Sequence, residues 1–278
     1  MRTILVGLDG SDDCLPAVDL GIRWAKRFDS LLIGIGVVDE PSIRGFQPEG
    51  HVSPTYQVAY EQLLKETRHK VERALEQFAI RCSNERISFK LLEDEGQPCE
   101  RILTELQRYD LLILGCRTHF RHASDQHPCQ TLEHVLRAAS RPVVVAPQIS
   151  SIESREGIVV AYDGSVQSAR ALQAFLSTGL AADGGPIHIV SVHPDSLVEA
   201  ARIADRASEF LRFHDIDATR VPLVGSSASQ KFLTHAIENN VKLIVMGAYG
   251  QARVKEFFFG SATCTALEQT SIPLFLFH

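Results

Sequence analysis

The 278-residue chain lacks long apolar segments, clusters of basic residues and closely paired cysteines. No run reaches the ~18 apolar residues of a spanning helix, so we expect no membrane protein. The first residues lack the apolar core and the small-residue cleavage site of a secretory signal, and a cytoplasmic location is expected. The six cysteines form no C-x-x-C pair and are therefore expected to be reduced thiols.

Charge is also modest and evenly spread. The chain has 28 Lys and Arg against 34 Asp and Glu, for a formal net charge of −6. Nucleic acid is therefore not an expected partner. Hydrophobic residues make up 45% and charged residues 22%, as in ordinary globular proteins. The length suggests two domains.

Three short segments occur twice in the same order, which indicates duplication of one domain. The offset between the copies falls from 154 to 132 residues, so the first copy carries 22 additional residues in its middle. A short polar stretch near 148–156 suits a linker, and we expect domains at 1–149 and 154–278. The matched segments are 4–11 and 158–165, 111–115 and 243–247, and 141–145 and 272–276.

Apolar runs bounded by turn residues alternate with segments of helical periodicity. Ala17, Leu20, Gly21, Trp24 and Phe28, for example, share one helical face. We expect each half to be a doubly wound α/β domain, a five-stranded parallel sheet flanked by helices, whose ligands bind beyond the carboxyl ends of the strands. The expected strands are 3–8, 31–38, 87–93, 111–115 and 143–146, then 157–162, 187–193, 219–223, 243–247 and 274–277.

A spaced set of glycines follows the fourth expected strand of the second half. Two residues separate Gly247 from Gly250, and nine residues separate Gly250 from the pair Gly260-Ser261. Glycines let backbone N–H groups approach phosphate, and a helix that begins at Ser261 would favour an anion. Alternatively, these glycines only turn a loop and cap a helix.

The spacing Gly247-x2-Gly250-x9-Gly260-Ser261 resembles the nucleotide motif of the universal stress protein family, G-x2-G-x9-G-[S/T]. The Asp-Gly-Ser after each first strand and the Ile-Pro before the last strand are also similar to that family. The likeness covers essentially the whole chain, twice. It implies a tandem, stress-response regulatory protein that binds ATP or AMP in its C-terminal domain, with Mg²⁺ as a candidate companion ion and no enzymatic turnover beyond slow hydrolysis.

The resemblance places Asp163 at the nucleotide base and Val192 against adenine. Arg253 and, less directly, Lys255 lie in the nine-residue loop, where they could neutralise phosphate charge or only be solvated. Asp163 could instead only turn the chain and cap a helix, and Val192 could be core. Gln251 stands where many members carry His or Arg. The expected nucleotide-binding set is Ala161, Tyr162, Asp163, Val192, Met246, Gly247, Gly250, Arg253, Gly260, Ser261 and Ala262.

The first half keeps Asp9-Gly10-Ser11 and Gly115 but departs elsewhere. Thr118 or His119 replaces the second glycine, and Cys129-Gln130, preceded by Pro128, replaces Gly260-Ser261. We expect this half not to bind ATP in the family manner. Its loop carries side chains of the kind that bind zinc, at a non-standard spacing. Two interpretations remain open: a metal site, or a decayed loop with scattered histidines. These ligands are Cys116, His119, His122, His127, Cys129 and His134.

Two other functions remain open. An adenylating enzyme of the wider α/β superfamily would resemble S-G-G-x-D-S after the first strand, but neither half has the double glycine. A pure interaction scaffold is the other. The final strands, 142–146 and 273–277, are apolar sheet edges that seek partners; we expect them to pair as an intramolecular pseudo-dimer, with a homodimer through Phe257–Phe259 as an option. The sequence of the insertion near 41–54 does not indicate a role for it.

Overall fold

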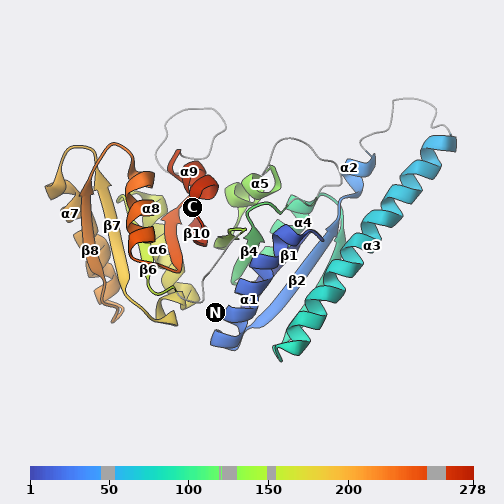
Figure 1. Ribbon diagram of the computed structural model, residues 1–278, viewed down its shortest axis with the longest axis horizontal. Coiled ribbons are helices and arrows are strands. Elements are labelled where there is room, and N and C mark those ends of the chain that lie inside the picture. Colours follow the sequence, from blue (N-terminus) through green and yellow to red (C-terminus); the bar gives the residue numbers. More distant parts are fainter. Residues whose placement is uncertain (45–53, 119, 121–129, 149–154, 249–260) are drawn as a thin grey trace. The chain divides into compact units, whose positions relative to one another are not determined.

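A computed structural model describes residues 1–44, 54–118, 120, 130–148, 155–248 and 261–278. The chain divides into two compact units (Figure 1). The N-terminal unit comprises Arg2–Arg141, and the C-terminal unit comprises Met1 and Pro142–His278. In the described residues no helix is both long and apolar enough to cross a membrane.

Four parallel strands form the sheet of the N-terminal unit in the order β3-β2-β1-β4. Their apolar runs are buried because helices cover both faces of such a sheet. The strands are β1 (Thr3–Leu8), β2 (Leu31–Val38), β3 (Phe89–Glu95) and β4 (Leu111–Gly115). The helices are η1 (Asp12–Cys14), α1 (Leu15–Phe28), α2 (Glu40–Arg44), α3 (Pro54–Asn84), α4 (Pro98–Leu106) and α5 (Gln130–Ala138).

The sheet order dictates where the helices lie. The chain moves from β1 to β3 in one direction and then returns to β4, and right-handed crossovers therefore place α1 and α3 on one face and α4 and α5 on the other. The packing agrees, because α3 contacts β2 and β3 while α4 contacts α5 and β2. The carboxyl ends of β1 and β4 form the switch point at which ligands bind in such sheets.

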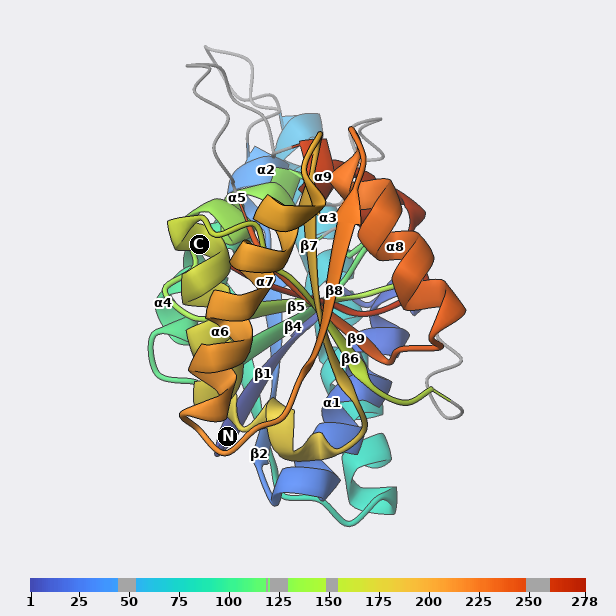
Figure 2. The same cartoon turned by 90° about the vertical axis from the view of Figure 1, so that its left-hand side faces the viewer.

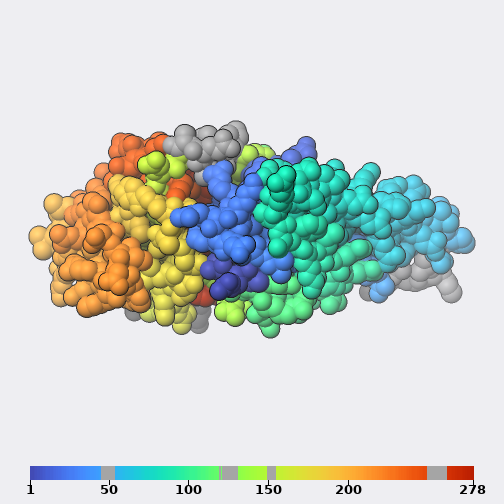
Figure 3. All heavy atoms as spheres, turned by 90° about the horizontal axis from the view of Figure 1, so that it is seen from below, coloured from blue at the N-terminus to red at the C-terminus, as the bar shows by residue number. Residues whose placement is uncertain are grey.

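The described part of the additional residues in the first copy is helical. They supply α2 and lengthen α3 to 31 residues, against 16 for its counterpart α7 (Leu197–Arg212). The first turns of α3 are mostly exposed, whereas Val71, Leu75 and Phe78 further along pack into the core. Figure 3 shows this first part of α3 in light blue at the surface of the N-terminal unit.

The C-terminal unit repeats the fold with strands in the order β5-β10-β9-β6-β7-β8. Figure 2 shows α6 and α7 on one face of its sheet and α8 on the other. The strands are β5 (Val143–Ala146), β6 (Ile158–Ala161), β7 (Ile187–His193), β8 (Thr219–Val224), β9 (Leu243–Gly247) and β10 (Leu274–Phe277). The helices are α6 (Val166–Thr178), η3 (Leu180–Asp183), α7, α8 (Ala228–Glu238) and α9 (Ser261–Gln269).

The two final strands pair with each other, as expected from their apolar edges. β5 groups with the C-terminal unit and pairs antiparallel with β10, with Val144 opposite Phe275. Both side chains are fully buried. The pairing has a plain cause, because an unpaired apolar edge of β10 would expose backbone and Leu-Phe-Leu side chains to water.

Candidate functional site

The carboxyl ends of β6, β7 and β9 meet at one edge of the C-terminal sheet. Ala161, the last residue of β6, lies opposite Met246 of β9, and opposite Val190 of β7 on its other side. Val192 is two residues further along β7. The structure therefore brings the first group of expected site residues to neighbouring strand ends; that group is Ala161, Tyr162, Asp163, Val192, Met246 and Gly247.

Asp163 lies in a turn that starts helix α6. Its carboxylate Oδ1 accepts a hydrogen bond of 2.9 Å from the backbone N–H of Ser165, and Gly164 between them has a φ of 78°. The Ser165 hydroxyl in turn accepts from the N–H of Ser168 at 3.1 Å and caps the helix. The turn-forming role of Asp163 is thus present. Its side chain is nevertheless exposed, and a carboxylate has about four acceptor positions, so a ligand can still bind it.

The first glycine of the motif has a packing role. A Cβ on Gly247 would lie 2.7 Å from the backbone carbonyl carbon of Gln167 and 2.7 Å from the nitrogen of Ser168. The equivalent Gly115 of the N-terminal unit would bring a Cβ within 2.3 Å of the Asp13 carbonyl oxygen. In both units the glycine lets the helical segment that follows the neighbouring first strand, α6 or η1, approach closely. This residue alone therefore does not indicate a nucleotide.

In the matching turn of the N-terminal unit the aspartate side chain is buried. Asp9 is only 6% exposed, and its Oδ1 accepts from both the backbone N–H and the hydroxyl of Ser11 at 3.0 and 2.6 Å. A Cβ on Gly10 would lie 2.8 Å from Cγ of Lys70 on α3. At Gly164 the nearest atom to such a Cβ is 3.6 Å away, on Ile203. The two turns share a sequence but differ in access.

Backbone and side-chain bonds also fix the end of β6. The N–H of Tyr162 donates to the Val190 carbonyl at 2.9 Å, and the buried Ser191 hydroxyl donates to the Tyr162 carbonyl at 2.7 Å. Burial raises the pKa of the Tyr162 phenol, nearby Asp163 raises it further, and the positive charge of Arg206 opposes both. The phenol therefore stays neutral and acts at this edge only as a hydrogen-bonding group.

His193, which ends β7, was not predicted as a site residue from the sequence. Its Nδ1 accepts from the backbone N–H groups of Asp195 and Ser196 at 3.2 and 3.0 Å. Ser196 caps α7 by accepting from the N–H of Glu199. A histidine directly before Pro-Asp-Ser at a strand end was the available signal. This imidazole organises the loop beside Val192.

Several expected residues lie outside the described part of the chain. They include Gly250, Arg253, Lys255 and Gly260 of the motif and His119, His122, His127 and Cys129 of the first half. Ser261 begins α9, and Ala262 is half-buried in its first turn. Among the residues that are described, no three His, Cys, Asp or Glu side chains gather as a metal site.

Comparison with known proteins gives consistent matches. A curated relative, a universal stress protein of Synechocystis sp., is 28% identical over 178 residues, which is 61% of this chain and 58% of that protein. The chain thus spans less than two thirds of that relative. The solved universal stress protein of Archaeoglobus fulgidus matches 99% of this chain and 97% of its own with 19% identity and a TM-score of 0.73.

A third match, to a universal stress family protein of Arabidopsis thaliana solved with AMP bound, covers 53% of this chain and 92% of that one, at 16% identity and a TM-score of 0.38. The family model described as the universal stress protein family matches residues 1–147 and again residues 155–278. Since these two matches cover nearly the whole sequence, the chain belongs to the universal stress protein family as a tandem of two domains.

Proposed function

We propose that the C-terminal unit binds one adenine nucleotide, ATP or AMP, and that the chain is a nucleotide-responsive regulatory protein of the cytoplasm. The observation that carries the proposal is the difference between two equivalent carboxylates. Asp163 is exposed at the switch point, whereas Asp9 is only 6% exposed and Lys70 lies beside the adjacent Gly10. A ligand therefore has better access to the carboxylate of Asp163 than to that of Asp9.

Each part of the nucleotide has a partner by its chemistry. The carboxylate of Asp163 accepts hydrogen bonds from an adenine amine or ribose hydroxyl, and Val192 offers half-buried apolar surface to the base. Helix α9 begins at Ser261, and the N-terminus of a helix favours phosphate. The motif assigns Gly250, Gly260 and Arg253 to the phosphates, where Mg²⁺ would neutralise charge when ATP is the ligand.

The proposed activity is binding without turnover. A hydrolase or adenylating enzyme needs a general base aimed at the reacting atoms. The nearest imidazole along β7, His193, already accepts two backbone hydrogen bonds through Nδ1, and the Tyr162 phenol is kept neutral by burial. Regulation would follow from a change in conformation or partner on nucleotide binding.

Isothermal titration of the full chain with ATP and with AMP tests the proposal. We expect one site per chain, and we expect Asp163→Asn, which keeps an acceptor for the Ser165 amide, to weaken binding about tenfold or more through loss of a charged hydrogen bond. Gly260→Val should abolish binding because a side chain would occupy the phosphate position. The matched control is Asp9→Asn in the other unit, which should leave affinity unchanged.

The alternatives predict different results. No heat with either nucleotide in the wild-type chain would overturn the proposal and leave an interaction scaffold. Exchange of pyrophosphate into ATP would indicate an adenylating enzyme. Loss of binding in Asp9→Asn but not in Asp163→Asn would place the site in the N-terminal unit and overturn the proposal.

A further inference from the structure

The N-terminal unit contains a cavity that the nucleotide proposal does not use. Its volume is about 280 Å³, close to the lower end of ordinary small-molecule pockets. No residue of the Asp9–Ser11 turn lines it. The lining residues are Asp39, Pro41, Ser42, Gln97, Pro98, Cys99, Thr131 and His134.

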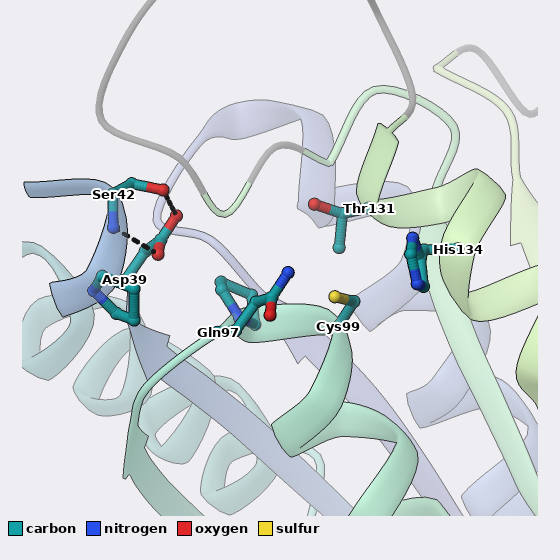
Figure 4. A pocket seen from close by; sticks show the side chains of 8 residues that line it. Asp39, Ser42, Gln97, Cys99, Thr131 and His134 are labelled. Carbon is teal, nitrogen blue, oxygen red and sulfur yellow. Dashed lines mark hydrogen bonds between the residues drawn. The ribbon is translucent and has the colours of Figure 1, made fainter. Parts of the chain in front are cut away.

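The cavity lies at the ligand-binding edge of the sheet. Asp39 directly follows β2, Gln97 lies between β3 and α4, and Thr131 and His134 belong to α5, which follows β4. Figure 4 shows Asp39 and Ser42 on one side of the cavity and Thr131 and His134 on the other, with Gln97 and Cys99 between them. Carboxyl-end loops of three strands thus surround one polar space, as is typical of ligand sites in α/β sheets.

One end of the cavity is an acceptor. Asp39 is 1% exposed, and its Oδ1 and Oδ2 accept from the backbone N–H and the hydroxyl of Ser42 at 3.2 and 2.5 Å. These two bonds hold the carboxylate in place and leave further lone pairs on both oxygens. A buried and fixed carboxylate of this kind prefers ligand groups that donate, such as hydroxyls.

The other end is rich in donors. Helix α4 begins at Pro98, and the side chain of its N-cap residue Gln97 makes no capping bond. Its counterpart in the C-terminal unit, α8, is capped by Ser227, which accepts from the N–H of Gln230 at 3.4 Å. Pro98 has no N–H and the Arg101 N–H donates to the Gln97 carbonyl at 3.1 Å, so the start of α4 favours an acceptor or an anion mainly through the helix dipole. The hydroxyl of Thr131 and the imidazole of His134 add donors across the cavity.

We propose that this cavity binds a small polyhydroxylated anion, such as a sugar phosphate or a sugar acid. Its hydroxyls would meet Asp39 and Ser42, and its phosphate or carboxylate would meet the start of α4 and the side chains of α5. The rings of Pro41 and Pro98 supply apolar surface for the C–H face of a sugar. The site is independent of the nucleotide site, because every lining residue belongs to the N-terminal unit.

Titration of the full chain with four probes tests the site and its ligand chemistry. The probes are ribose 5-phosphate, gluconate, ribose and inorganic phosphate. We expect one molecule of ribose 5-phosphate or gluconate per chain, and at least tenfold weaker binding of ribose and of phosphate alone, because each engages one end only. Whichever of the first two binds more tightly identifies a sugar phosphate or a sugar acid.

Variants locate the binding. His134→Ala changes an exposed residue at the rim of the cavity and should weaken binding of the anionic probe about tenfold. Asp39→Asn should also weaken binding, because the ligand hydroxyls would lose a charged acceptor. His69→Ala, an exposed histidine of α3 outside the cavity, is the matched control and should change nothing. Asp163→Asn should also change nothing, so that failure of the nucleotide proposal and failure of this one are separable.

The thiol of Cys99 gives a second measurement. A bound probe should slow iodoacetamide labelling of Cys99, followed by mass spectrometry of peptides. Burial raises the pKa of Cys14 and of Cys82 to about 11, so both react slowly and serve as internal references. The proposal is overturned if neither anionic probe binds, if binding survives both cavity variants, or if Cys99 is labelled in the free protein and the bound probe leaves that labelling unchanged.

Discussion

Nδ1 of His188 on β7 lies 2.8 Å from Nε2 of His235 on α8. Only one of these two nitrogens can carry the hydrogen between them, so the pair is bonded only while at least one ring is neutral. The amide of Asn239 also contacts the His235 ring, at 3.3 Å. The pair links the sheet of the C-terminal unit to a covering helix.

This pair should make the unfolding free energy depend on pH. Burial lowers the pKa of both imidazoles below 6.5, and for His235 the neighbouring His188 lowers it further while Glu238 opposes the change. The unfolded chain therefore binds protons more readily, so stability should be complete above pH 6.5 and fall as the pH drops from 6.5 toward the folded-state pKa values. Urea unfolding between pH 8 and pH 5 measures it.

The control is the double variant His188→Gln with His235→Gln. His278, half-buried near Arg170, also has a lowered pKa and contributes a pH dependence of the same sign. The informative quantity is therefore the difference between the wild-type and double-variant curves. Equal slopes in the two proteins would show that the histidine pair does not titrate on unfolding.

Gly247→Ala should destabilise the C-terminal unit by crowding. The new Cβ would meet backbone atoms of Gln167 and Ser168 at 2.7 Å, and backbone cannot rotate away as a side chain can. We expect a loss of about 1–3 kcal/mol, as for other overpacked sites, measured by urea unfolding. Gly184→Ala is the comparison for backbone strain without crowding, since Gly184 has a φ of 86° and a ψ of 166° with no atom within 4 Å, and strain of about 1–3 kcal/mol should appear without any crowding of neighbours.

Ser165→Ala should remove the cap of α6. The Ser165 hydroxyl accepts from the N–H of Ser168, and loss of such a cap costs about 1 kcal/mol. Ser11 is the equivalent residue, but it makes no side-chain cap bond and instead donates to Asp9. Ser11→Ala should therefore leave the helix start unaffected and remove only the hydroxyl hydrogen bond to Asp9, because the backbone N–H of residue 11 still donates to it. Similar amide-exchange protection of Ser168 in wild type and Ser165→Ala would contradict this.

The strands were largely predictable from the sequence because each is an apolar run between turn residues. Thr3–Leu8, Leu111–Gly115 and Ile187–His193 begin and end as expected. β3 begins two residues later than expected, at Phe89, because it is an edge strand whose mixed polar and apolar residues define no sharp boundary. The pairing of β5 with β10 was expected from the two apolar edges, whereas its antiparallel direction was not stated, since strand direction depends on tertiary contacts.

The site was less predictable. The Asp163 turn followed from its Asp-Gly-Ser sequence, but the contact of the equivalent N-terminal turn with Lys70 depends on α3, which lies some 60 residues further along the chain. The cavity beside Asp39 and the His188–His235 pair were missed for a similar reason. Their residues come from separate segments, and neither spacing nor composition links them before the chain folds.

The pairing of β5 with β10 predicts how fragments of the chain should associate. A fragment of residues 142–278 keeps β5 and should be a stable monomer, because the outer edge of β10 stays paired. A fragment of residues 155–278 lacks β5 and leaves an apolar edge whose Leu274, Phe275 and Leu276 are otherwise at most 1% exposed. Such edges pair with other chains, so this fragment should dimerise or aggregate, as light scattering after size exclusion would show.

Val144→Pro in the 142–278 fragment separates the strand pairing from the mere presence of extra residues. Val144 lies opposite Phe275 in the ladder, and proline removes a backbone donor and does not fit an internal ladder position. This variant should associate as the 155–278 fragment does, whereas Val144→Ile, which keeps the strand, should stay monomeric. A 155–278 fragment that is monomeric and as stable as the 142–278 fragment would mean that β10 needs no partner strand. The antiparallel pair would then contribute nothing to the stability of the C-terminal unit.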